Sequence, residues 1–314
     1  MPFKKILALR PDRMGDAILT LPAVSAIKEK YPCAEISFLA DERIAPLFKN
    51  HPHISEVIPW RREEGVCSLR KRIKASGFDA AVHFFIKRET VLAAAFGAVP
   101  LTVGPFSKIW ALLLDKKVKQ HRRKSIKHEA DYNLDLAGEL GAPVSPRPAM
   151  LGLLPEEKEE ARKKLSRSSI KPDAPFFLIH PGGARRGVPL PPEKFLEISR
   201  ALGNQGKEVI VSIGPEEPEL AEFFSEFPVR RGGGIREFAS LISLAACFIS
   251  NSTGPLHLAC ALSTPTVSFF GREKGVSPVR WGPYPPSSRN RVFFADEFSV
   301  DEVLSAVARA GTTG

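Results

Sequence analysis

The first half of the chain alternates short apolar runs with segments whose apolar residues recur every three or four positions. The runs have the length of buried strands. Between the first two runs, Ile18, Leu21, Val24 and Ile27 form one apolar stripe of a helix, which Pro22 should kink or restart. Strands separated by helices predict βαβ units and a parallel sheet. The expected strands are 5–10, 35–40, 54–60, 78–84 and 100–103. One helix is expected from about residue 15, and others at 42–49, 66–75, 90–96 and 129–140.

The second half repeats this alternation after a break. Residues 104–128 are irregular and basic, and residues 143–155 carry four prolines with little periodicity, so we expect a linker there. The pattern predicts an α/β fold with two domains, 1–148 and 149–314. The expected strands are 175–180, 208–213, 247–249, 265–270 and 291–294, and the helices are 156–165, 193–202, 217–224, 235–245, 254–262 and 300–310.

Composition narrows the class of protein. Hydrophobic residues make up 43% and charged residues 25% of the chain, which is ordinary for a globular protein. No apolar run approaches the roughly 20 residues of a membrane span. The apolar run at 6–9 is too short for a signal peptide, so we expect a cytoplasmic protein. The four cysteines are scattered and suggest neither a disulfide framework nor a zinc site.

The net charge of +10 favours an anionic partner, whether nucleic acid, an acidic membrane or a phosphorylated substrate. The densest basic stretch is 116–124, continuing to Lys127. Such a stretch is either a solvated loop or a patch that meets the phosphate groups of a lipid-linked acceptor. We favour the patch, because the run is longer than an ordinary helix face requires.

Two strand-to-helix junctions carry candidate chemistry. In open α/β sheets, ligands bind beyond the carboxyl ends of the strands. After the first strand, Gly15 permits close backbone approach and Asp16 would project from the first helical turn. The alternative is that Asp16, or Asp12 before it, only caps the helix.

The second junction is 249–257. Ser252, Thr253 and Gly254 place hydroxyls and N–H groups at a helix N-terminus, which is a geometry that binds phosphate, and His257 falls in the first turn. The alternative is an ordinary Ser/Thr cap with a surface histidine.

Two further strand ends carry weaker signals. Gly182 and Gly183 with Arg185 and Arg186 suit a diphosphate, because arginine contacts phosphate oxygens in a bidentate manner, although a solvated loop explains any one of them. Glu217 follows the strand 208–213, and a carboxylate at a strand end can accept hydrogen bonds from the hydroxyls of a ribose. The alternative is that it lies in the first turn of a helix and interacts favourably with the helix dipole.

Several common motifs are missing from the sequence. There is no Gly-x-Gly-x-x-Gly, Walker A loop, Gly-x-Ser-x-Gly or His-Glu-x-x-His. Hydride transfer, phosphoryl transfer and serine hydrolysis therefore lose support.

Three segments together resemble a known family. The segment 9–23 resembles the N-terminal signature of glycosyltransferase family 9, the ADP-heptose:lipopolysaccharide heptosyltransferases. His180 to Gly183, followed by 191–195, resembles the middle motif of that family, and 251–259 with 264–271 resembles its C-terminal donor motif. The motifs occur in the family's order across nearly the whole chain.

The resemblance implies a GT-B fold, in which two facing Rossmann-like domains have a central cleft. The N-terminal domain would bind the acceptor and the C-terminal domain the nucleotide sugar, and the last helix, 300–310, could cross back onto the N-terminal domain. The implied activity is inverting transfer of a heptose or related sugar from ADP-heptose to a lipopolysaccharide core or lipid A-linked acceptor, without metal or cofactor. The implied partners are a nucleotide-sugar donor, a lipid-linked saccharide acceptor and the inner face of the membrane, bound peripherally, but no nucleic acid.

The resemblance also assigns roles to residues. Asp16 corresponds to the proposed general base, and its place at a helix end predicts an ionised, weak base. The expected substrate-binding residues are Arg13, Gly15, Gly182, Gly183, Arg185, Arg186, Glu217, Ser252, Thr253, Gly254 and His257.

Two positions depart from the family pattern. The middle motif lacks its usual lysine, since Val188 and Leu190 stand there, and Arg185 or Arg186 would replace its charge. Ser252 stands where the family often has aspartate. The alternatives are a GT-B enzyme with another nucleotide sugar, and a membrane-binding or nucleic-acid-binding protein without transferase activity.

Overall fold

The chain divides into two units, Met1–Gly152 and Leu153–Gly314. The sequence placed the boundary after residue 148, within the same proline-rich stretch. The computed structural model describes residues 3–166, 174–183 and 190–311. No helix among these residues is both long enough and apolar enough to span a bilayer.

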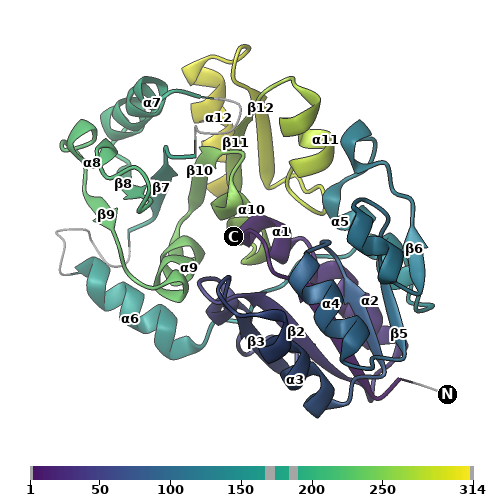
Figure 1. Ribbon diagram of the computed structural model, residues 1–314. Coiled ribbons are helices and arrows are strands. Elements are labelled where there is room, and N and C mark those ends of the chain that lie inside the picture. The colour runs from purple at the N-terminus through teal and green to yellow at the C-terminus, as the bar shows by residue number, and fades with distance from the viewer. Residues whose placement is uncertain (1–2, 167–173, 184–189, 312–314) are drawn as a thin grey trace. The chain divides into compact units, whose positions relative to one another are not determined.

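The first unit is built on a parallel sheet of six strands in the order β3-β2-β1-β4-β5-β6 (Figure 1). The central strands are buried from end to end because helices cover both faces, which explains their continuous apolar runs. The strands are β1 (Lys5–Arg10), β2 (Glu35–Asp41), β3 (Glu56–Trp60), β4 (Ala80–His83), β5 (Leu101–Pro105) and β6 (Lys116–Val118).

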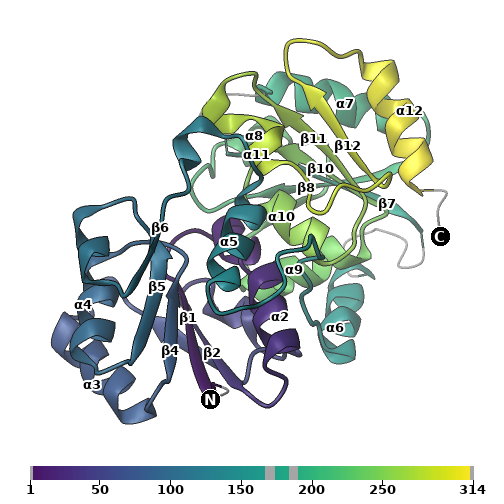
Figure 2. The same ribbon diagram turned by 90° about the vertical axis from the view of Figure 1, so that its right-hand side faces the viewer.

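Helices flank this sheet on both sides. Figure 2 shows α3 and α4 on one face and α2 and α5 on the other, in agreement with the close packing of α3 on α4 and of α2 on α5. The helices are α1 (Met14–Ile18), α2 (Leu21–Lys30), α3 (Val66–Ser76), α4 (Arg88–Phe96) and α5 (Glu129–Gly138), with 3-10 turns η1 (Ala45–Phe48), η2 (Ile109–Leu113) and η3 (Arg122–Lys124).

Most elements of the first unit match the sequence pattern, and two differ. The helix expected from residue 15 breaks at Leu19–Thr20 and restarts as α2, with Pro22 in its first turn, as predicted. The helix expected at 42–49 is only the 3-10 turn η1. Proline is tolerated in the first turn of a helix but not in its interior, so Pro46 prevents a helix that begins at residue 42. The stretch 104–128, expected to be irregular, contains the strand β6. Two of the three residues of β6 are lysines, so it lacks the apolar pattern of a buried strand.

The second unit repeats the same topology. Its six parallel strands run β12-β11-β10-β7-β8-β9, so β7 and β10 occupy the places that β1 and β4 hold in the first unit. The short β9 was not predicted. The strands are β7 (Phe176–His180), β8 (Glu208–Ile213), β9 (Val229–Arg231), β10 (Cys247–Asn251), β11 (Thr266–Phe270) and β12 (Asn290–Phe294).

Helices α7, α8 and α12 share one core with the second sheet, and α6 packs beside α9 (Figure 1). The last helix buries Val303, Ala306 and Val307 in this core, against its own unit. The elements are α6 (Pro155–Ser166), α7 (Pro192–Asn204), α8 (Leu220–Phe223), α9 (Ile235–Leu244), α10 (Gly254–Ala261), α11 (Pro278–Trp281), α12 (Val300–Gly311) and the 3-10 turn η5 (Lys274–Val276).

Candidate functional site

Each sheet has a topological switch point, where consecutive connections leave toward opposite sides. The switch lies between β1 and β4 in the first unit and between β7 and β10 in the second. Loops diverge there and leave room beyond the carboxyl ends of the strands, which is where open α/β sheets bind ligands. The loops that carry the predicted site residues start at three of these strands, β1, β7 and β10, and at β8.

The centre of the first site is the buried guanidinium of Arg10, the last residue of β1. Its side chain is 2% exposed. It donates to Asp12 Oδ1 at 2.8 Å, to Asp16 Oδ1 at 2.5 Å and to Glu129 Oε1 at 3.2 Å. It also donates to the backbone oxygen of Phe84, just beyond β4, at 3.0 Å. One cation therefore joins the two strands of the switch point to three carboxylates.

A second guanidinium, that of Arg122 in η3, reinforces this cluster. It pairs with Glu129 and, like Arg10, donates to Asn133 Oδ1 at 3.3 Å. Asn133 Nδ2 in turn donates to the backbone oxygen of Leu19 at 2.9 Å, which fixes the break between α1 and α2. Arg122 belongs to the basic run that we expected to bind phosphate groups. In the structure it instead pairs with Glu129, which also contacts Arg10.

Three of these residues were not found from the sequence. Glu129, Arg122 and Asn133 lie more than one hundred positions from Arg10 and carry no local motif. The one available signal was the charge of Glu129 at the start of a helix with apolar residues. A carboxylate in a buried position needs a partner.

The cluster decides the protonation of Asp16. Burial raises its pKa to about 7, the Arg10 guanidinium opposes that rise, and the neighbouring carboxylates of Asp12 and Glu129 add to it. The expected weak, fully ionised base is therefore wrong. The helix-end argument fails because α1 has only five residues, while desolvation acts on a side chain that is 18% exposed.

The capping alternative also fails. The N-cap of α1 is Arg13, which makes no side-chain capping bond, and both Asp12 and Asp16 are held by Arg10. Arg13 is exposed at the start of the helix, and Gly15 is buried beneath it. The structure thus aims the Asp16 carboxylate at the strand ends and leaves it partly open to solvent.

In the second unit, three predicted residues come from three neighbouring strand ends. The N–H of Gly183, after β7, donates to both carboxylate oxygens of Glu217, after β8, at 2.9 and 3.2 Å. A Cβ atom on Gly183 would lie 2.2 Å from Thr253 Cγ2, and one on Gly182 would lie 2.2 Å from Glu217 Oε2. Gly183 also has a φ of +95°. Glycine is required at 183, where the positive φ and the Thr253 methyl group both exclude a side chain, whereas at 182 the flexible Glu217 side chain would have to move.

Glu217 lies outside α8, whose first turn holds Glu222, so the helix-dipole alternative for Glu217 is wrong. Its carboxylate holds the Gly182–Gly183 turn.

The turn before α10 presents donors to solvent. Ser252, Thr253 and Gly254 are half-buried, and the N–H groups of Thr253 and Gly254 meet no acceptor in the described part of the chain. The Thr253 hydroxyl donates to the Asn251 backbone oxygen at 3.3 Å and does not cap the helix. Buried Asn251 anchors the turn by pairing with both backbone groups of Leu190, at 3.1 and 3.2 Å. An anion would meet these donors at the positive end of α10.

Two histidines lie under these turns. His257 is 4% exposed, so the surface-histidine alternative is wrong, and it supports α10 from its buried side. His180, at the end of β7, lies between Phe238 and Phe248 with Nδ1 3.1 Å from Ser212 Oγ. Burial lowers the pKa of His180 to about 4, so it is neutral at pH 7.

Three residues of the middle motif, Arg185, Arg186 and Val188, lie outside the described residues. Among the residues that are described, no group of three His, Cys, Asp or Glu side chains is arranged to hold a metal ion.

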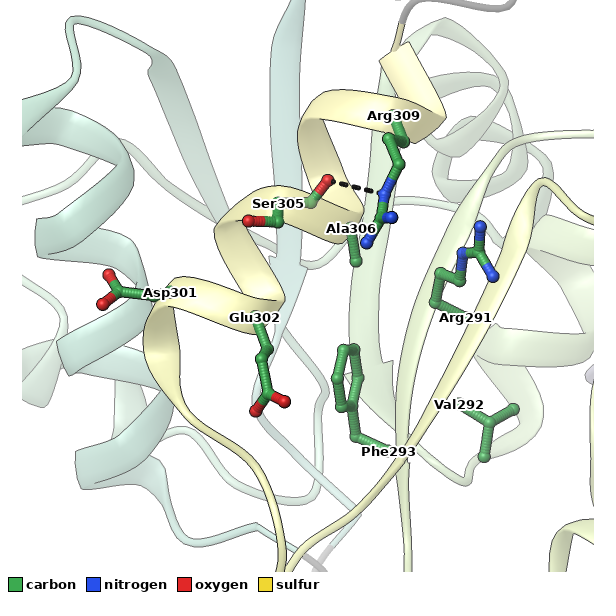
Figure 3. A pocket seen from close by; sticks show the side chains of 8 residues that line it. All are labelled: Arg291, Val292, Phe293, Asp301, Glu302, Ser305, Ala306 and Arg309. Atoms are coloured by element: carbon green, nitrogen blue, oxygen red, sulfur yellow. Dashed lines mark hydrogen bonds between the residues drawn. The ribbon is translucent and has the colours of Figure 1, made fainter.

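A separate groove of about 820 Å³ lies between β12 and α12 (Figure 3). None of the predicted site residues lines it. Its lining combines two arginines with two carboxylates and Phe293, so the charges are mixed and favour no anion. The residues are Arg291, Val292, Phe293, Asp301, Glu302, Ser305, Ala306 and Arg309.

Comparison with known proteins gives consistent results. The family model described as "Glycosyltransferase family 9 (heptosyltransferase)" matches residues 66–297, about three-quarters of the chain. A curated relative, lipopolysaccharide heptosyltransferase 3 of Escherichia coli, is 26% identical over 89% of this chain and 85% of its own length.

Two solved structures share the fold. The glycosyl transferase family 9 structure from Veillonella parvula has a TM-score of 0.89 at 18% identity, over 100% of this chain and 98% of its own. An E. coli heptosyltransferase solved with ADP-2-deoxy-2-fluoro heptose has a TM-score of 0.71 at 19% identity, over 97% and 99%. The predicted α/β fold of the GT-B class, with two Rossmann-like units, is confirmed.

The raised pKa of Asp16 predicts a specific dependence of stability on pH. Asp16→Asn should raise the free energy of unfolding by about 1–3 kcal/mol above pH 7, because it removes a carboxylate whose ionisation the fold opposes. Since the folded pKa exceeds the unfolded one, the gain should shrink as the pH falls from about 7 to about 4. Urea unfolding at a series of pH values measures this.

Asp79→Asn is the matched control, with the opposite sign. The backbone N–H groups of Lys4 and Lys5 lower the pKa of Asp79, so its replacement should destabilise the protein near neutral pH, and the effect should vanish in acid. Destabilisation by Asp16→Asn at every pH would contradict the analysis of the cluster.

Proposed function

Because the chain is a glycosyltransferase of family 9, the heptosyltransferase family, we propose that it transfers a heptose or related sugar from ADP-heptose to a lipopolysaccharide acceptor. The acceptor is a saccharide linked to the lipopolysaccharide core or lipid A. We assign acceptor binding to the first unit and nucleotide-sugar binding to the second. One observation carries the proposal: a carboxylate with a pKa near 7 occupies one switch point, and a donor-rich turn occupies the other.

The turn before α10 suits the donor diphosphate. Two N–H groups and the hydroxyls of Ser252 and Thr253 would meet phosphate oxygens at a helix N-terminus. The related E. coli enzyme that was solved with a fluorinated ADP-heptose supports ADP as the carrier. Glu217, which already holds the Gly182–Gly183 turn, would offer its remaining lone pairs to a ribose hydroxyl.

Asp16 is the proposed general base. As the oxygen of an acceptor hydroxyl forms a bond to the anomeric carbon, the bond from that carbon to the diphosphate oxygen breaks. The hydroxyl proton passes to Asp16, and the nucleoside diphosphate leaves with the bonding electrons. A single displacement of this kind inverts the anomeric centre. A pKa of about 7 suits this role, because a substantial share of the carboxylate is ionised at neutral pH and its affinity for a proton is higher than that of an ordinary aspartate.

Charge on the leaving diphosphate would be stabilised by fixed groups rather than by a metal ion. The helix N-terminus supplies aligned N–H dipoles. We assign the remaining positive charge to Arg185 and Arg186, which follow the glycine turn in sequence and stand in for the missing lysine of the family motif. Arg13, exposed beside Asp16, and Gly15 are assigned to the acceptor side.

The lipid-linked acceptor suggests where in the cell the enzyme acts. We propose that the enzyme acts in the cytoplasm, bound peripherally to the inner face of the membrane, and that its net charge of +10 serves anionic lipid and phosphorylated substrates rather than nucleic acid.

Asp16→Ala should reduce kcat for transfer from ADP-heptose by about 100-fold to 10,000-fold, the usual contribution of a general base, with ADP affinity within about twofold. In the wild type, kcat/KM should rise with pH through an apparent pKa of about 7. Radiolabelled sugar transfer and calorimetric titration with ADP measure the two effects.

Asp12→Asn is the matched control, because Asp12 also pairs with Arg10, and it should keep kcat within about tenfold. UDP-linked and GDP-linked sugars should transfer far more slowly than ADP-heptose. Activity of Asp16→Ala close to that of the wild type would reject Asp16 as the base, and preference for another nucleotide would reject the proposed donor.

Gly183→Ala should weaken ADP binding by about tenfold or more, since the new methyl group displaces Thr253 and strains a left-handed residue. Gly206→Ala shares the positive φ, at +73°, but its methyl group meets nothing within 4 Å. It therefore controls for backbone strain alone and should leave ADP affinity unchanged. Equal losses in the two variants would contradict a donor site at this turn.

A further inference from the structure

A short segment after β5 exposes an unusual amount of apolar surface. Within 106–113, the exposed fractions are 46% for Phe106, 73% for Ile109, 36% for Trp110, 58% for Leu112 and 46% for Leu113. We call this stretch the η2 segment. Single exposed apolar residues are normal on a protein surface, but five large ones within eight positions are a concentrated patch.

The segment is held in this exposed state by the fold. Ala111 and Leu114 are buried with Ile86 and Val91, so the 3-10 turn is anchored by its inward side. Two lysines add polar anchors, since Lys108 Nζ donates to the Ile86 backbone oxygen at 2.9 Å and Lys117 Nζ donates to that of Leu114. The outward apolar side chains therefore belong to an anchored turn.

Basic residues dominate the chain from the patch onward. From 106 to 127 the chain has eight lysines and arginines and one acidic residue, Asp115, which is engaged with Thr102. Lys119, Arg123 and Lys124 are exposed and form no ion pair with any residue that the structure describes. Ile126, within this basic stretch, is also exposed, at 66%.

This combination identifies the partner. A nucleic acid would use the positive charge but not the exposed isoleucines and leucines, and a protein partner would use the apolar surface without needing such an excess of charge. An anionic bilayer uses both, because apolar and aromatic side chains enter its interfacial layer while lysines and arginines attract its headgroups.

The ring of Phe85 links the η2 segment to the Arg10 cluster, which contains the proposed catalytic carboxylate. Lys108 Nζ lies 4.2 Å from the ring centroid of Phe85, and the guanidinium carbon of Arg10 lies 6.0 Å from the same centroid. Arg122, from the far end of the basic stretch, belongs to the Arg10 cluster itself. One bound surface would thus bring a lipid-linked substrate to the side of the first unit where Asp16 lies.

We propose that the η2 segment inserts Ile109, Trp110, Leu112 and Leu113 into the interfacial layer of an anionic membrane, while Lys119, Arg123 and Lys124 bind its headgroups. The proposal rests on the proposed function for the identity of the lipid-linked acceptor, but the membrane contact itself does not depend on catalysis.

Flotation of the full-length protein with vesicles tests the contact. Wild-type protein should bind phosphatidylcholine vesicles that contain phosphatidylglycerol, and bind weakly to phosphatidylcholine alone or at high salt. The double variant Ile109→Ser, Leu112→Ser should lower vesicle affinity by about tenfold or more, because both side chains are exposed and their loss costs only membrane burial. Val144→Ser with Val279→Ser, each 57% exposed, is the matched control and should bind as the wild type does.

A second pair of variants tests the binding of anionic headgroups by the basic residues. Arg123→Glu with Lys124→Glu should abolish the preference for phosphatidylglycerol, whereas Lys207→Glu with Arg289→Glu, the same charge change in the second unit, should reduce it far less. Absence of wild-type binding to anionic vesicles would overturn the proposal, as would equal affinity of the Ile109, Leu112 variant. A concentration-dependent dimer that this variant loses would assign the patch to a second copy of the chain instead.

Transfer to a water-soluble acceptor fragment, without vesicles, separates this proposal from the proposed function. The Ile109, Leu112 variant should retain wild-type kcat on that acceptor, and lose rate only on acceptor embedded in vesicles. If wild-type protein binds vesicles but transfers no sugar, the proposed function fails and the membrane contact stands.

Discussion

The buried guanidinium of Arg10 is the constraint on which the first unit depends. An arginine cannot escape burial by losing its proton, so the fold must surround it with acceptors. Asp12, Asp16, Glu129 and the backbone of Phe84 provide them. Three carboxylates around one cation leave an excess of negative charge, which the second guanidinium, from Arg122, only partly offsets. Asp16, the most exposed of the three, is left with a proton affinity far above that of an ordinary aspartate.

The described loops of the second unit present backbone groups rather than side-chain cations. The N–H groups of Thr253 and Gly254 meet no acceptor in the described part of the chain. Glycines at 182 and 183 let three strand ends approach so closely that a single methyl group would collide with Thr253 or Glu217. Asn251 then fixes the turn by taking both backbone groups of Leu190. The two units share one topology, and the loops at equivalent strand ends carry a cluster of carboxylates in one and backbone N–H groups in the other.

The sequence predicted what local pattern determines. Period and length located nearly every long strand and helix, and glycine-containing junctions located Asp16, Gly183 and Thr253 at strand ends. It did not reveal Glu129, which meets Arg10 from 119 residues away, because that pairing depends on the fold. For the same reason it gave the wrong basicity for Asp16, since desolvation by distant residues outweighs a five-residue helix. The exposure of the η2 segment was also hidden, because an apolar run reads as core until its neighbours are known.

The central claim is that burial within the Arg10 cluster sets the proton affinity of Asp16. Carbon-13 NMR of protein labelled at aspartate carboxyl carbons tests it directly, with the Asp16 signal assigned by its absence from Asp16→Asn. We expect a titration midpoint of about 7 for that signal. A midpoint near 4, the value of an exposed aspartate, would contradict it.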